Sequence, residues 1–154
     1  MGRKTSAVGW MLRGAAAGAA GTTALNVVAY LDMAVRGRPA SSTPERTVER
    51  LAESVQLRVP GYGETQANRL EGLGALTGLV AGVGVGGLLG LARASGFRAG
   101  TLLTTLTVLV STNGPMTVLK VTDPRTWSVV DWISDLVPHL AYAAVVTNTL
   151  DALE

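Results

Sequence analysis

Residues 72–92 read GLGALTGLVAGVGVGGLLGLA and contain no charged side chain. Glycine recurs within them at every fourth position, at Gly74, Gly78, Gly82, Gly86 and Gly90. In water, each glycine inside a helix costs roughly 0.8–1 kcal/mol relative to alanine. In lipid, the backbone must bond to itself, so the segment stays helical and its small residues let a second helix approach closely. These five residues, which we name the glycine ladder, therefore predict a membrane helix.

Three further stretches lack charged residues, and each is compared with the roughly 20 residues that a helix needs to cross a bilayer. They cover residues 14–31, 99–119 and 136–150, the last directly after Asp135. We therefore predict an all-α fold, an integral membrane bundle of four transmembrane helices that forms a single domain over residues 1–154. The expected spans are about 8–35, 70–93, 98–120 and 126–151, and Asp123 with Pro124 is expected to start the last one.

The N-terminus also fits a second interpretation. Arg3 and Lys4 precede an Ala-rich stretch that resembles the apolar core of a cleavable signal peptide. Arg13 interrupts the start of this stretch, and the apolar character continues to Val35, which is longer than a signal core. We therefore expect a retained first helix.

Composition excludes several classes of protein. The chain is 47% hydrophobic and 16% charged, has a net charge of only +2, and contains no cysteine and one histidine, His139. It therefore has no disulfide framework, no thiolate metal site and no multi-histidine metal site. A nucleic-acid-binding surface would need clustered Lys and Arg, and no nucleic-acid partner is expected. No nucleophile elbow or phosphate-binding loop is present, so we predict no enzyme activity and no cofactor.

One long polar segment, residues 36–71, separates the first two spans. Ser42 or Thr43 as N-cap, with Pro44 in the first turn, predicts a short helix over about residues 43–57. Its apolar residues share one face: Val48, Leu51, Ala52 and Val55. Two placements stay open, a helix on the membrane surface and a connector helix that packs on its own protein. We favour the connector, because that face has no Trp or Phe.

Polar residues collect at one end of the predicted bundle, since antiparallel spans bring the ends of the first and third helices to the start of the fourth. This polar cluster consists of Asp32, Arg36, Asn113, Asp131, Asp135 and His139. Ionisable groups at membrane depth are costly and usually face a bundle interior or a water-filled cavity. Two roles stay open, a structural tie between helices and the handling of protons or ions. A metal site built from the three aspartates and His139 has suitable ligands but no diagnostic motif, so none is predicted.

The first span offers a partner for the glycine ladder. Gly14 and Gly18 form a small-residue step on one row of this helix, and such steps favour close helix crossings. We expect part of the ladder to pack on this row. Because the ladder drifts about 40° around a straight helix at each step, one partner does not cover it all. The remaining glycine surface is expected to bind a second copy or another membrane subunit.

The last helix carries a resemblance. Ser134, Asp135, His139 and Leu140 stand in the order S-D-L-V-P-H-L behind a tryptophan-bearing helix start. This stretch resembles one in small multi-helix bacterial inner-membrane proteins of the YagU-like type, in which glutamate takes the place of the aspartate. The resemblance covers one helix of the four and does not include the glycine ladder. It implies a membrane bundle in the bacterial inner membrane and no particular reaction.

The sequence therefore predicts a protein of the cell membrane, plasma or inner, in contact with the lipid bilayer. We expect an accessory, scaffold or self-associating subunit that acts through glycine-mediated helix packing. The alternative is a small oligomeric channel or transporter for protons or a small solute, using Asp135, His139 and Asn113. Both termini are expected in the cytoplasm, because the short loop on their side carries Arg93 and Arg98 and no acidic residue.

Overall fold

The computed structural model describes residues 5–154, so Arg3 and Lys4 lie outside the described part. All regular structure in the described part is helical, which confirms the all-α class. The elements are α1 (Ala7–Arg36), α2 (Thr43–Ser54), α3 (Glu64–Ala94), α4 (Thr101–Val118), the 3-10 helix η1 (Pro124–Thr126) and α5 (Val129–Ala152).

The helix starts differ from the sequence-based boundaries where turns and caps intervene. α3 begins at Glu64, directly after Gly63 with its positive φ of 56°, and its polar first turn precedes the apolar stretch that predicts the membrane span over about 70–93. α2 ends at Ser54, where the main chain turns at Gln56 with a positive φ of 59°. Both differences lie in polar sequence, where hydropathy gives no boundary.

The predicted start of the last helix at Asp123 and Pro124 is wrong. Asp123 caps only η1, where it accepts a hydrogen bond from the Arg125 main-chain N–H at 3.1 Å. Side-chain hydrogen bonds from Arg125 lower the pKa of the Asp123 carboxyl. α5 starts after Ser128, whose hydroxyl accepts from the Asp131 N–H while the Asp131 carboxylate accepts from the Ser128 N–H. This reciprocal capping box satisfies two main-chain donors, which the isolated Asp123 cap does not.

Of the helices in the described residues, α3 and α5 are long and apolar enough to cross a membrane by length and composition. α1 and α4 are long enough, with 30 and 18 residues, but they are not apolar enough to meet this criterion. The reason is compositional. α1 contains four glycines, two threonines and Asn26, all of low hydropathy, and α4 carries repeated Thr together with Asn113.

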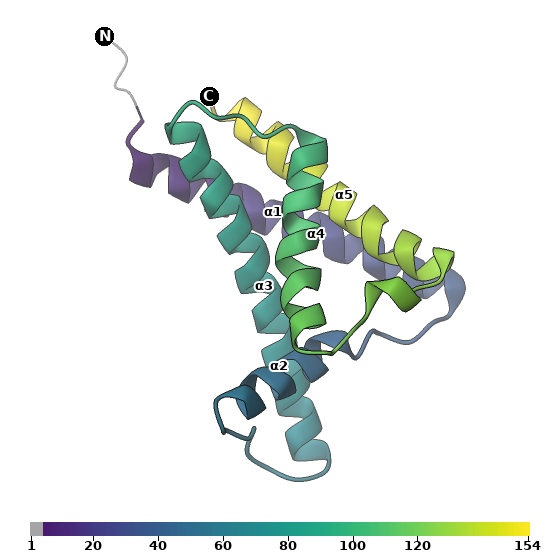
Figure 1. Cartoon of the computed structure of the whole chain (residues 1–154). Helices are drawn as coiled ribbons and strands as arrows, with labels where there is room; N and C mark the ends of the chain where they lie inside the picture. The colour runs from purple at the N-terminus through teal and green to yellow at the C-terminus, as the bar shows by residue number, and fades with distance from the viewer. Residues whose placement is uncertain (1–4) are drawn as a thin grey trace.

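Figure 1 shows four long helices that come together at one end and spread apart at the other. The start of α1, the end of α5 and the connection between α3 and α4 lie at the converging end. α1 contacts both α3 and α5, and α4 lies mainly on α5. α2 packs against α3 near the start of that helix. The long helices that contact each other therefore run in roughly opposite directions and cross obliquely.

The packed core is small and is centred on the meeting of α1, α3 and α5. Its most buried large side chain is Tyr142 of α5, which is fully enclosed. The other members come from all four long helices: Ala17, Val85, Leu89, Val108, Val146 and Leu150. Because the core is thin, glycine and threonine supply much of the remaining interior surface.

Candidate functional site

The main chains of α1 and α3 touch along two rows of glycine. A Cβ atom added to Gly14 would lie 2.2 Å from the Gly86 carbonyl oxygen, and one added to Gly18 would lie 2.5 Å from the Gly82 carbonyl oxygen. A Cβ on Gly90 would lie 2.1 Å from the Trp10 carbonyl oxygen. Real side chains do not fit at such distances, so glycine is required on both helices at this crossing.

α5 closes over the same crossing. The Tyr142 hydroxyl donates a 2.6 Å hydrogen bond to the Gly82 carbonyl oxygen of α3. On α1, a Cβ added to Gly21 would lie 2.6 Å from Val146 and 2.8 Å from the Tyr142 ring. The missing side chain at Gly21 therefore lets α5 pack closely on α1, as Gly14 and Gly18 let α3 do. The sequence shows Gly21 beside the glycine row but gives no reason to assign it to a different neighbour.

The glycine ladder divides among three environments. Gly82, Gly86 and Gly90 face α1, as described above. Gly74 faces α2, where an added Cβ would lie 3.0 Å from Pro44. Gly78 has no atom within 4 Å of an added Cβ and is exposed. One ladder thus packs on two helices of the same chain and keeps one open position.

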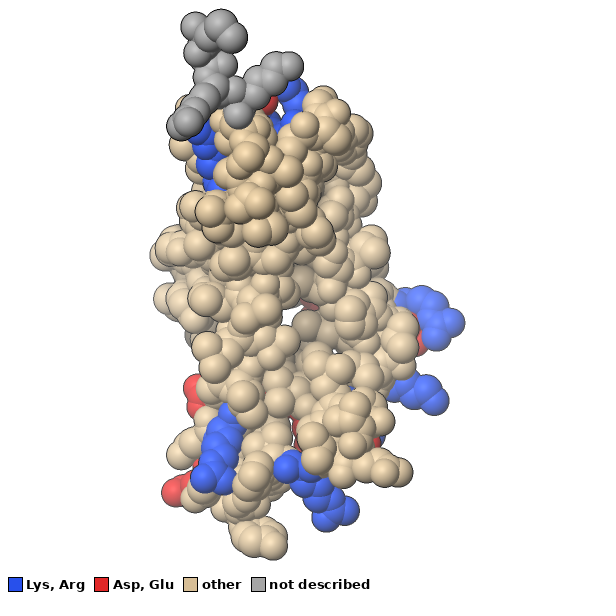
Figure 2. All heavy atoms as spheres, turned by 90° about the vertical axis from the view of Figure 1, so that its left-hand side faces the viewer, with Lys and Arg blue, Asp and Glu red and all other residues tan. Residues whose placement is uncertain are grey.

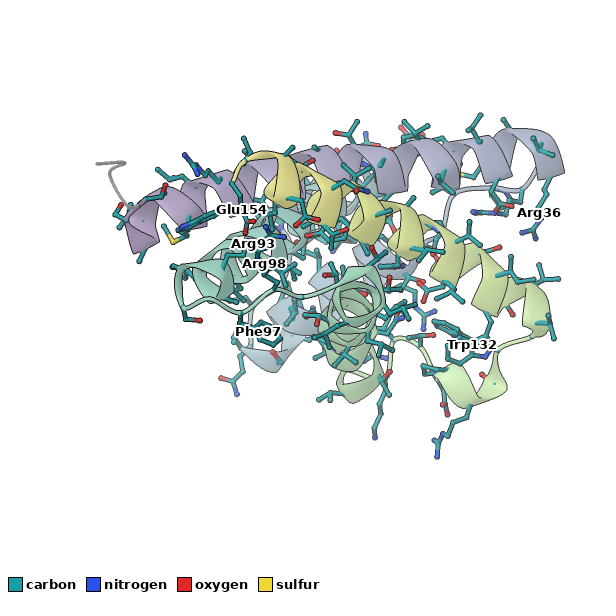
Figure 3. The ribbon with its side chains drawn as sticks, turned by 90° about the horizontal axis from the view of Figure 1, so that it is seen from above. Arg36, Arg93, Phe97, Arg98, Trp132 and Glu154 are labelled. Carbon is teal, nitrogen blue, oxygen red and sulfur yellow. The ribbon has the colours of Figure 1, made fainter. Side chains whose placement is uncertain are left out.

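Arg36 joins the end of α1 to the first turns of α5. Arg36 pairs with Asp32 at 3.2 Å on its own helix and donates a 2.7 Å hydrogen bond to the Ser134 hydroxyl of α5. Arg38 also pairs with Asp32, at 2.6 Å. Figure 3 shows Arg36 at the end of α1, far from the arginines at the other end of the molecule. Arg36 therefore links the end of α1 to Ser134 near the start of α5.

α4 and α5 share the second part of the polar cluster. The Asn113 amide donates a 2.8 Å hydrogen bond to the Asp135 carboxylate. The Nδ1 atom of His139 lies 2.7 Å from the Asp135 carbonyl oxygen and 3.4 Å from its carboxylate. The Nε2 atom lies 3.3 Å from the Thr112 hydroxyl. Thr112, which precedes Asn113 directly, is not among the predicted site residues.

Asp131 stands apart from this group. Its carboxylate accepts hydrogen bonds from the Ser128 N–H and hydroxyl, at 2.9 and 2.7 Å, and the residue is exposed. The described residues contain no set of three or more His, Cys, Asp or Glu side chains that could hold a metal ion. The three aspartates and His139 are not assembled, because Asp32 is bound by arginines and Asp131 by the capping box.

A group of arginines at the other end was not predicted. The Arg93 side chain is 4% exposed and pairs with Asp151 and Glu154, and it also donates to the Leu150 carbonyl oxygen at 3.1 Å. Arg98 pairs with Glu154 at 2.6 Å. Figure 3 shows Arg93, Arg98 and Glu154 together at the end of α5. These charged residues are far apart in the sequence, and the fold brings them within reach of one another.

A pocket of about 220 Å³, open to the outside, lies between the end of α2 and the start of α3. Its walls include Glu49, Glu53, Arg58 and Gln66, and none of the predicted site residues.

Comparison with protein-family models, with curated proteins and with solved structures finds no match for this chain. The resemblance of the last helix to the YagU-like type therefore stays a prediction.

Proposed function

We propose that the chain is a small integral membrane protein whose four long helices all cross the bilayer. In this proposal it acts by helix association, as an accessory or scaffold subunit or by binding a second copy of itself. It lies in the cell membrane, plasma or inner, with both termini in the cytoplasm.

The observation that carries the proposal is the distribution of large and small residues. In α3 most buried positions are glycine, whereas Leu76, Val80 and Leu88 are 59–70% exposed. Only 33% of the apolar window in α3 and 22% of that in α5 are buried. A core helix of a soluble protein would bury its large apolar side chains. Small residues inside and large ones outside are the arrangement expected of helices in lipid.

α1 and α4 fit the same arrangement despite their lower hydropathy. Near the start of α4, Thr104 is fully buried and Thr105 is 4% exposed, whereas Leu102 is 78% and Val110 70% exposed. The Thr105 hydroxyl also bonds to the Thr101 carbonyl of its own helix at 2.8 Å, which satisfies it without water. Two of the threonines that lower the average hydropathy of α4 are therefore buried.

The positions of the charges support a membrane placement. On the face in Figure 2, Lys, Arg, Asp and Glu lie at the two ends and along one edge, and an uncharged band separates the ends. At the start of α5, Trp132 packs edge to face with Trp127, their ring centroids 5.0 Å apart. Tryptophan is enriched where membranes meet water.

The exposed part of α3 around Gly78 is the surface that we propose for association. Gly78 is exposed, and an added Cβ there would meet no atom within 4 Å. Gly72 and Gly84 are exposed too, but a spacing of six residues places them on other sides of the helix. An exposed glycine in an apolar helix lets a second helix approach closely in lipid.

A matched pair of variants tests this role. Gly78→Leu adds a large side chain where the chain itself has open space, and Gly82→Leu adds one where Thr22 already lies 2.0 Å from an added Cβ. We expect Gly82→Leu to lower the thermal stability of the purified chain. We expect Gly78→Leu to keep that stability but to reduce the native mass of the detergent-extracted assembly. An unchanged native mass for Gly78→Leu, or an unchanged size and stability for Gly82→Leu, would contradict the proposal.

One observation favours a second candidate function, a channel or carrier for protons or a small solute. Asn113, Asp135 and His139 form a connected, half-buried group between two proposed spans. Ionisable groups in such a place often mark ion or proton pathways. In liposomes this function predicts that Asp135→Asn and His139→Ala abolish flux. Full flux in both variants would eliminate these residues as the pathway.

A further inference from the structure

α2 packs most closely on α3 at its own start. A Cβ added to Gly74 of α3 would lie 3.0 Å from Pro44 in the first turn of α2. Within α2, all of whose residues are described, the one buried residue is Thr47, also near the start. An open pocket separates the end of the helix from α3. The connector helix expected from the sequence is therefore attached to its own protein mainly at one end.

The apolar side of α2 is largely left open. The predicted apolar face consists of Val48, Leu51, Ala52 and Val55. Leu51 is 43% and Val55 63% exposed, and Leu57, just after the helix, is 64% exposed. A helix that packs fully on its own protein turns its apolar stripe to the core. A group of exposed large apolar side chains rimmed by polar residues instead marks a contact with a membrane or a partner.

The charged residues of α2 lie on its other side. Arg50 and Glu53 are both exposed, form an ion pair at 3.1 Å and lie roughly opposite the middle of the apolar face. A helix with one apolar and one charged side is the form that lies in the plane of a membrane surface. Three glutamates and two arginines give α2 a net charge of −1. Its apolar side chains, rather than attraction to anionic lipids, therefore have to supply the contact.

The level of α2 along α3 coincides with the edge of the proposed membrane span. Glu71 is the last charged residue before the charge-free residues 72–92. Gly74, which meets the start of α2, lies three residues after Glu71, or about 4.5 Å further along the helix. The pocket at the other end of α2 is lined by Gln66 and Leu70, which come just before the charge-free residues. α2 therefore lies where headgroups meet hydrocarbon, and Figure 1 shows it lying across the lower part of α3.

The surface of α3 beside this crossing indicates what covers α2. Leu73 and Leu76 lie on either side of Gly74 in the sequence and are 42% and 59% exposed. In the proposed membrane placement such side chains face lipid. Lipid is therefore already present at the level of the crossing, and no second protein is needed to cover the open side of α2.

We infer that α2 is an interfacial helix that lies in the headgroup layer and places Leu51 and Val55 against the lipid acyl chains. The apolar face of such a helix is buried about 5–10 Å into the boundary between headgroups and acyl chains. The inference rests on the proposed membrane function, because α2 has no lipid to contact without a bilayer. It adds a contact that the association role does not include, between the long polar segment and the membrane surface.

The test locates single spin labels on the full chain in nanodiscs of phosphatidylcholine. The chain has no cysteine, so Leu51→Cys and Val55→Cys each accept one label, with Arg50→Cys and Glu53→Cys as matched controls on the charged side. Collisions with oxygen, which concentrates in lipid, and with a neutral nickel chelate, which stays in water, report the surroundings. We expect the ratio of oxygen to nickel collisions to be several-fold higher at residues 51 and 55 than in the controls. Anionic lipid should leave this difference unchanged, because α2 carries no net positive charge.

A fifth label, at Val80→Cys on α3, separates failure of this inference from failure of the membrane function. Val80 is 70% exposed within the proposed span. If residue 80 is in lipid while residues 51 and 55 meet the nickel chelate, α2 is a connector in water and the inference is wrong. If residues 51 and 55 are shielded from both reagents, protein covers them and the inference is again wrong. If residue 80 itself meets the nickel chelate, the proposed membrane function fails, and this inference fails with it.

Discussion

Gly86 lies in the middle of the crossing of α1 and α3. A Cβ added there would lie 2.4 Å from the Gly14 carbonyl oxygen and 2.6 Å from the Gly18 Cα atom. Both are main-chain atoms, so neither can move without shifting α1 as a whole. At Gly82 the nearest atom belongs to the Thr22 side chain, which can turn away. The requirement for glycine is therefore stricter at Gly86 than at Gly82.

At this scale we predict that Gly86→Ala destabilises the chain by about 1–3 kcal/mol, the usual cost of overfilling a packed interior. Gly84→Ala is the matched control, because it makes the same change two residues away, where an added Cβ meets no atom within 4 Å. It should cause no loss of stability. Unfolding in detergent micelles, followed by circular dichroism, measures both. Equal behaviour of the two variants would show that the α1–α3 contact is not as close as described.

At the scale of the element, α5 is held differently at its two ends. Its start has a capping box made by Ser128 and Asp131. Its end has the buried Arg93, which donates to the Leu150 carbonyl and pairs with Asp151 and Glu154. A cation near a helix C-terminus bonds the last carbonyl groups and interacts favourably with the helix dipole. Arg93 thereby ties the last turn of α5 to the end of α3.

We predict that Arg93→Gln loosens this last turn. Because the Arg93 side chain is 4% exposed and makes three contacts, its loss should increase amide hydrogen exchange over residues 150–154 without affecting the start of α5. Arg98→Gln removes a pair whose arginine is 68% exposed, and such surface pairs contribute only about 0–1 kcal/mol. Exchange should change little in that control. If Arg98→Gln loosened the turn as much as Arg93→Gln, burial of Arg93 would not be the cause.

Comparison of these elements with the sequence shows what local patterns predict. The helices and their order follow from hydropathy, and the spacing of Gly14, Gly18 and the ladder indicates their close approach. The predicted start of α5 at Asp123 was wrong because Asp123 and Ser128 are both possible N-caps and lie close together in the sequence. The reciprocal hydrogen bonds between Ser128 and Asp131 place the start after Ser128. The contacts of Arg93 with Asp151 and of Thr112 with His139 join residues on different helices. Their pairing depends on how those helices are oriented, which one sequence does not specify.

At the scale of the whole molecule, many of the buried positions are glycine, alanine or threonine, whereas most leucine side chains are exposed. The polar side chains of α1 and α4 lower their hydropathy, yet Thr22, Thr104 and Thr105 are buried within the bundle. Large apolar side chains such as Leu31, Leu76, Leu102 and Ile133 are exposed on all four long helices. This shared exposure is the basis for proposing four membrane spans.

The proposal that four helices cross the membrane is tested most directly by the accessibility of single cysteines in sealed membrane vesicles of known orientation. The chain has no cysteine of its own, so Ala7→Cys, Ser41→Cys, Ser95→Cys and Arg125→Cys each place one reactive thiol at an exposed position outside the proposed hydrocarbon region. A membrane-impermeant thiol reagent should label residues 41 and 125 from one side only, and residues 7 and 95 from the opposite side only. Labelling of residues 41 and 125 from opposite sides, or of residues 7 and 41 from the same side, would contradict a bundle of four spans.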